Sequence, residues 1–70
     1  MSKNYIVLNG DGIVVAEYDE LDHAVESARE NAAQAAYDGD LSNFYSVTLP
    51  DWTQPEGDGP FDFRADQVVL

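Results

Sequence analysis

Hydrophobic residues near the start of the chain form two short runs on either side of a glycine-rich turn. Residues 5–8 and 13–18 are rich in β-branched and aromatic types, and residues 10–12 between them read Gly-Asp-Gly. Such residue types favour strands, and such a turn is typical of a tight hairpin. The sequence therefore predicts a β-hairpin. Its register stays open, because apolar residues occupy both alternating faces of the first run.

From Leu21 onward the hydrophobic pattern changes to steps of three and four residues, which is the period of an amphipathic helix. We expect this helix to run from about Asp19 or Leu21 to about Tyr37. Asp19 is the predicted N-cap, and the Asp-Gly-Asp sequence at 38–40 supplies the C-terminal stop. The apolar positions are Leu21, Ala24, Val25, Ala28, Ala32, Ala35 and Ala36.

After the helix, alternating residues predict a third strand over 44–49, and Pro50 closes it. Residues 51–60 are rich in Pro and Gly and predict a long loop. Alternation over 61–70 predicts a fourth strand. The expected fold is a single acidic α+β domain over 1–70, of order β-β-α-β-β, with one amphipathic helix packed on a four-stranded antiparallel sheet. The predicted core is Ile6, Leu8, Val25, Ala28, Ala32, Val47, Phe61 and Phe63.

Composition adds a strong negative charge to this fold. The chain has 70 residues, 14 acidic and only three basic, for a formal net charge of -11, yet 44% of its residues are hydrophobic. That hydrophobic content indicates a folded body instead of an acidic tail. The charge repels nucleic acid and anionic lipid and attracts basic surfaces. We therefore expect a basic protein partner, no direct binding to nucleic acid and no binding to membranes.

Targeting, metal and catalytic signals are weak. The first apolar run is too short for a signal peptide or a membrane span, so we expect a cytoplasmic protein. There is no cysteine, and a calcium loop starting at Asp38 would have Asn43 and Leu49 at its glycine and glutamate positions. His23, the only histidine, lies among carboxylates on the first helical turn. We expect no catalytic residue, no metal site, no cofactor and no enzyme activity.

The most informative pattern is a row of acids along the outer side of the predicted helix. Neighbours three or four residues apart on a helix lie roughly 5–6 Å from each other, similar to successive phosphates of a nucleic-acid strand. Such a row can imitate a phosphate backbone. The alternative is an ordinary solvated helix face, but such faces mix charge signs, and here only Arg29 opposes the acids. This acidic ridge consists of Asp19, Glu20, Asp22, Glu26 and Glu30.

A second acidic group lies in the predicted loops around Trp52, the only tryptophan. An exposed aromatic ring among carboxylates would form an anchor between arginines of a partner. The alternative is that Trp52 caps the small core. Net charge is spread almost evenly along the chain, which weakens the case for one dedicated patch. The expected partner-binding residues of this group are Asp38, Asp40, Asp51, Trp52, Glu56 and Asp58.

Size, charge and the acidic ridge on a small α+β body together resemble the acidic DNA-mimic inhibitors of bacteriophages. That group includes small anti-CRISPR proteins, the uracil-DNA glycosylase inhibitor and blockers of restriction. The resemblance covers the whole chain in composition and plan, with Asp19, Asp22, Glu26 and Glu30 as its most specific residues. It implies an inhibitor in the host bacterial cytoplasm that blocks the basic nucleic-acid-binding channel of a defence complex, with a CRISPR-Cas effector subunit as first choice.

Two other classes of protein stay open. A haloarchaeal protein is also acidic and poor in lysine, because its carboxylates hold water and salt ions. An antitoxin or an acidic subunit of a larger complex is the third class. Salt separates the first two: a halophilic domain should need molar salt to fold, whereas a mimic should fold in ordinary buffer and lose partner affinity as salt rises.

Overall fold

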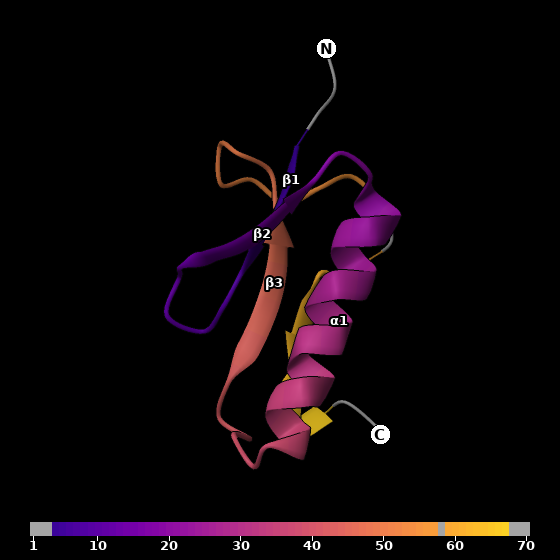
Figure 1. Cartoon of the computed structure of the whole chain (residues 1–70). Coiled ribbons are helices and arrows are strands. Elements are labelled where there is room, and N and C mark those ends of the chain that lie inside the picture. The colour runs from indigo at the N-terminus through magenta and orange to yellow at the C-terminus, as the bar shows by residue number, and fades with distance from the viewer. Residues whose placement is uncertain (1–3, 58, 68–70) are drawn as a thin grey trace.

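One helix packs against one face of a four-stranded antiparallel sheet, as the sequence predicts (Figure 1). The computed structural model describes residues 4–57 and 59–67. The strands lie in the order β2-β1-β3-β4, so the first hairpin forms one half of the sheet and β3 adds to its β1 side. The elements are β1 (Tyr5–Leu8), β2 (Val14–Tyr18), α1 (Leu21–Tyr37), β3 (Phe44–Thr48), β4 (Asp62–Arg64) and a 3₁₀ turn, η1 (Ala65–Gln67).

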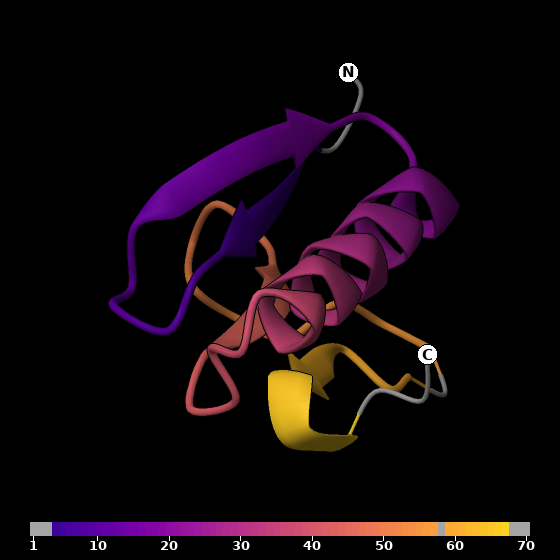
Figure 2. The same cartoon turned by 60° about the horizontal axis from the view of Figure 1, so that its bottom comes forward.

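The core lies between α1 and the sheet. Val7 is fully buried at its centre and pairs with Ala16 of β2 on one side and with Val47 of β3 on the other. Small helix residues, among them Ala24 and Ala28, are also fully buried, because alanine lets the helix approach the strands closely. Figure 2 shows the sheet curving around one side of the helix.

The hairpin register, which the sequence left open, places Val7 and not Leu8 in this core. Of the predicted core residues, Ile6, Ala28, Ala32, Val47 and Phe61 are buried, and Leu8, Val25 and Phe63 are partly buried. Strand residues alternate between faces, so Ile6 lies on the face away from the helix, opposite Thr48 of β3. Both side chains are buried there, at 8% and 9% exposure.

The helix begins one residue later than the cap prediction required. The N-cap is Glu20, which is still extended (φ -126°, ψ 135°) and makes no side-chain capping bond. The prediction that Asp19 caps the helix is therefore wrong. The C-terminal stop is confirmed: Gly39 has a positive φ of 87°, and the amide of Asp40 donates to the carbonyl of Ala35 at 2.8 Å. Glycine adopts this left-handed conformation without steric cost.

The fourth strand is shorter than predicted. It ends at Arg64, and residues 65–67 turn into η1, so the prediction of a strand over 61–70 is wrong for this part. β4 ends here because its antiparallel partner β3 begins at Phe44, which pairs with Arg64. Beyond this pair, the amide of Ala65 still donates to the carbonyl of Asn43 at 3.0 Å. Ala65 is still buried, at 1% exposure. Residues 68–70 lie outside the described part.

Candidate functional site

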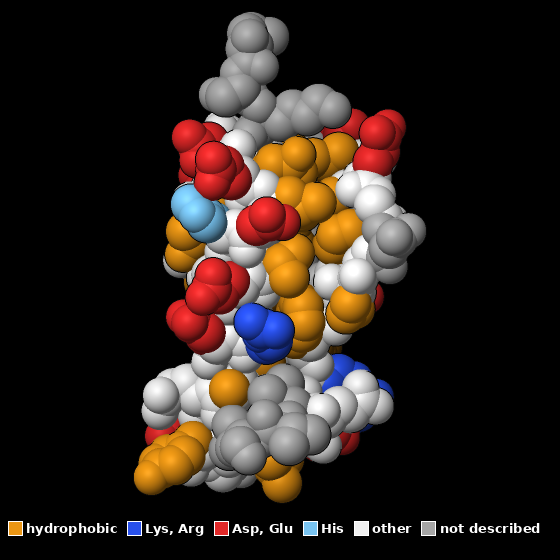
Figure 3. All heavy atoms as spheres, turned by 90° about the vertical axis from the view of Figure 1, so that its right-hand side faces the viewer, with side chains coloured by type: hydrophobic (Ala, Val, Ile, Leu, Met, Phe, Trp, Pro, Cys, Tyr) orange, Lys and Arg blue, Asp and Glu red, His pale blue; other side chains and the backbone are white. Residues whose placement is uncertain are grey.

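The acidic ridge lies on the solvent side of α1. Burial of the alanine stripe against the sheet fixes the rotation of the helix, and this rotation turns the ridge carboxylates outward. Figure 3 shows acidic side chains in a column along the helix, next to the histidine. Only three of the five ridge residues are on α1, because Glu20 is its N-cap and Asp19 precedes the cap. All five are exposed: Asp19, Glu20, Asp22, Glu26 and Glu30.

Little positive charge opposes the ridge. Every acidic residue in the described part is exposed, and only two ion pairs form there. One joins His23 Nε2 to Glu20 Oε2 at 3.2 Å, and it is charged on both sides only when the histidine is protonated. The other joins Arg64 Nη2 to Asp66 Oδ2 at 3.1 Å, away from the ridge. Within the described residues Arg29 makes no ion pair, so most of the ridge charge is not neutralised.

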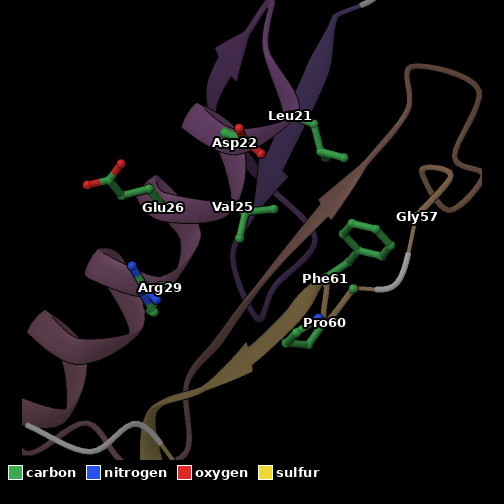
Figure 4. Close-up of a pocket in the computed structure, with 9 residues that line it drawn as sticks. Leu21, Asp22, Val25, Glu26, Arg29, Gly57, Pro60 and Phe61 are labelled. Carbon is green, nitrogen blue, oxygen red and sulfur yellow. The ribbon is translucent and has the colours of Figure 1, made fainter.

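A shallow groove runs along the helix beside the ridge. It has a volume of about 340 Å³ and lies between α1 and the segment that leads into β4. In Figure 4, Leu21 and Val25 of the helix lie across from Phe61, with Pro60 beside it. Figure 3 shows the corresponding band of hydrophobic surface between the acidic column and the neighbouring loop. The charged residues along the helix wall of the groove are Asp22, Glu26 and Arg29.

Sequence reasoning missed this groove. Phe61 was expected in the core, where it is indeed 5% exposed, and Pro60 was expected only to break regular structure. The position of these two residues beside the helix is set by tertiary structure, which periodicity does not encode. Leu21 and Val25 gave a partial signal, because they flank the fully buried Ala24 in the apolar stripe and are themselves only partly buried.

The second acidic group does not gather around Trp52. Asp38 and Asp40 follow the end of α1 and precede β3, whereas Asp51 and Trp52 follow β3. The length of β3 therefore separates the two pairs, at opposite ends of the molecule (Figure 1). Glu56 is exposed in the long loop, and Asp58 lies outside the described residues. The acid that does line a hollow with Trp52 is Asp62 of β4.

Trp52 lies on the surface, so it does not cap the core. Its side chain is 63% exposed, and its φ of 67° is in the left-handed region that bulky residues rarely adopt. A tight turn holds it there: the Trp52 amide donates to the Leu49 carbonyl at 2.9 Å, and the Leu49 amide donates to the Thr53 carbonyl at 2.9 Å. In tight turns glycine usually takes the left-handed position, because it has no Cβ. Whether Trp52 anchors a partner stays a prediction.

The carboxylate of Asp51 organises the same turn. Its Oδ1 accepts bonds from the Thr53 hydroxyl at 2.6 Å and from the Thr53 amide at 3.1 Å. These two bonds, the hydroxyl first, hold the pKa of Asp51 below its ordinary value, because they favour the charged form.

Catalytic and metal-binding arrangements are not evident in residues 4–57 and 59–67. The side chain of His23 is 60% exposed and contacts only Glu20 among charged groups. No cluster of three or more His, Asp or Glu residues in this part could hold a metal ion. None of its helices combines the length and the apolar character that a membrane crossing requires.

No protein-family model matches the chain, and comparisons with curated proteins and with solved structures found no match either.

Proposed function

We propose that this protein is a non-enzymatic inhibitor that imitates nucleic-acid charge and occupies the basic nucleic-acid-binding channel of a partner protein. The observation that carries the proposal is the acidic ridge: three exposed carboxylates on α1 (Asp22, Glu26 and Glu30) continue those of Asp19 and Glu20 just before it, and His23 makes the one ion-pair contact to them among the described residues. A helix fixes the carboxylates relative to each other, so a partner binds them without first ordering a loop. Long, aligned negative charge also accelerates association with a basic surface.

The small size of the body and the resemblance to phage DNA mimics favour a partner in a bacterial defence complex, with a CRISPR-Cas effector as first choice. Such an inhibitor acts in the cytoplasm of the host bacterium. It blocks the channel by competition and needs no cofactor, because charge and shape alone exclude the nucleic acid.

The test is capture followed by competition. Tagged protein, incubated with bacterial lysate at low salt, should retain one or a few basic nucleic-acid-binding proteins. The retained protein, once purified, should release the inhibitor when its own DNA or RNA is added, and the affinity should fall steeply as salt rises. A ternary complex of partner, nucleic acid and inhibitor would contradict mimicry even if inhibition is observed.

A halophilic domain is the second candidate, and two observations favour it: every described acid is exposed, and the acids are spread along the whole chain. Carboxylates spread in this way bind water and cations instead of one partner. Circular dichroism without added salt distinguishes the two proposals: a mimic is folded there, whereas a halophilic domain folds only as salt approaches molar concentration.

A further inference from the structure

The groove between α1 and the segment at Pro60 and Phe61 combines apolar and acidic side chains. Its floor is apolar, formed by Leu21, Val25 and Phe61 (Figure 4). Asp22 and Glu26 line its helix side, and the carboxylate of Glu26 points outward from the helix, away from Phe61. Charge alone would not require an apolar floor. An exposed apolar groove rimmed by charged residues is typical of a protein-binding site.

The charges along the groove are not symmetric. Asp22 and Glu26 lie toward the N-terminal end of α1, and Arg29 lies one turn further toward its C-terminal end. Figure 4 shows Arg29 on the helix beyond Glu26, further from Asp22. A cation bound over the groove is therefore attracted at one end and repelled at the other.

From this geometry we infer that the groove takes one apolar side chain of a basic partner segment, with the lysines or arginines of that segment over Asp22 and Glu26 and away from Arg29. The inference rests on the proposed function, since it assigns a partner chemistry to the surface beside the acidic ridge. Charge complementarity selects the basic segment, and the apolar floor selects the side chain between its charges. The ridge then supplies attraction, and the groove supplies discrimination among basic surfaces.

The test uses the full chain and two short lysine-rich peptides of equal net charge, which differ only in a central leucine or serine. Binding is followed by amide chemical shifts of ¹⁵N-labelled protein at low salt. The leucine peptide should bind roughly tenfold more tightly, because burying an aliphatic side chain is worth about 1.4 kcal/mol or more. Its largest shifts should fall on Leu21, Val25 and Phe61.

Variants of groove and ridge residues test whether the preference for the leucine peptide arises in the groove. Val25→Thr keeps the volume and β-branching of the side chain but places a hydroxyl in the groove, so it should reduce the preference for leucine and leave the salt dependence unchanged. Glu26→Gln and Glu30→Gln each remove one ridge charge, but only Glu26 lines the groove. Glu26→Gln should therefore weaken binding of the leucine peptide more than the matched control Glu30→Gln does.

The outcomes separate the two proposals. Equal affinity of the two peptides, with loss of binding at high salt, would overturn the groove inference and leave the acidic ridge intact. Shifts of the leucine peptide centred on Leu8, Phe44 and Trp52 would also overturn it, because these residues lie on or beside the opposite sheet face. Failure of both peptides to bind at low salt would count against the ridge as well.

Discussion

The hydroxyl of Tyr18, the last residue of β2, donates a hydrogen bond to Oγ of Ser27 in the middle of α1 at 3.0 Å. The same oxygen accepts a bond from Asn31 Nδ2 at 3.3 Å. Ser27 precedes the fully buried Ala28 and follows the exposed Glu26. This strand-to-helix contact therefore holds the rotation of α1 that keeps the ridge carboxylates in solvent.

Removal of that hydroxyl should weaken the fold. Tyr18→Phe keeps the ring, which packs against the core, and deletes only the donor. We expect unfolding free energy to fall by about 1 kcal/mol, the usual net contribution of a partly buried hydrogen bond. Urea denaturation measures this. Tyr37→Phe is the control, since that side chain is 80% exposed, and it should change stability by less than about 0.5 kcal/mol. Equal effects of the two variants would show that the Tyr18 contact is not stabilising.

The turn at Asp51 predicts a change in one pKa. The Thr53 hydroxyl is the largest cause of the lowered pKa of Asp51, so Thr53→Val should raise that pKa toward its ordinary value. Thr53→Ser keeps the hydroxyl and should leave the pKa low. A carboxyl-carbon NMR titration of Asp51 measures both variants. An unchanged pKa in Thr53→Val would mean that the backbone amide of residue 53 alone holds the carboxylate.

The sign of the associated pH dependence follows from the direction of the shift. A carboxyl group whose pKa is lower in the folded state stabilises the fold above its unfolded pKa, and this contribution is lost as pH falls through the folded pKa. Asp51 is fully exposed, so the contribution is small. The acid side of the pH-stability curve should accordingly become slightly less steep in Thr53→Val and stay unchanged in Thr53→Ser.

The helix and the order of elements could be predicted because both depend on local patterns. Apolar residues at steps of three and four, followed by the stop at Asp38-Gly39, define α1 without any knowledge of what it packs against. The face of β1 that enters the core could not be predicted, because Ile6 and Val7 are both apolar and only pairing with β3 decides between them. The end of β4 could not be predicted either, because it depends on where its partner strand β3 begins.

The ridge could be predicted for the same reason as the helix, whereas the rest of the surface could not. Acids spaced by helical steps share a face once the apolar stripe is known. The predicted grouping of loop acids around Trp52 is wrong because β3 lies between the two loops, so that Asp40 is at one end of this strand and Asp51 at the other. The groove needed the tertiary position of Phe61, which no local pattern supplies.

Salt should raise the melting temperature of the free protein. The chain carries a net charge of -11 within a radius of gyration of 11.4 Å, and all its described carboxylates are exposed to screening. Sodium chloride shortens the Debye length to about 8 Å at physiological ionic strength, which weakens the repulsion between these groups. Thermal melts from low salt to several hundred millimolar measure the effect. A flat or falling melting temperature would show that self-repulsion does not limit stability.

The most demanding prediction concerns two residues of the acidic ridge. Glu26 and Glu30 are exposed and point away from the buried alanine stripe, so the double change Glu26→Lys, Glu30→Lys should leave the fold intact. The lysine pair at 26 and 30 replaces a glutamate pair with similar repulsion. The attraction that position 26 gains to Asp22 offsets its new repulsion from Arg29 to within about 0.5 kcal/mol. Circular dichroism and melting should therefore resemble those of the unchanged protein.

Partner binding should respond very differently. The double reversal replaces two attractive charges by two repulsive ones in the half of the ridge that lies further along α1, so affinity for the basic partner captured at low salt should fall roughly tenfold or more, about 1.4 kcal/mol or more. Asp11→Lys, in the exposed hairpin turn, is the control for a single dispersed charge and should change mainly the association rate and the salt dependence. Titration calorimetry and stopped-flow mixing separate these effects. If the double reversal binds as tightly as the unchanged protein, the ridge is only a solvated helix face, and the contact surface must then be sought at Trp52 and the turn that holds it.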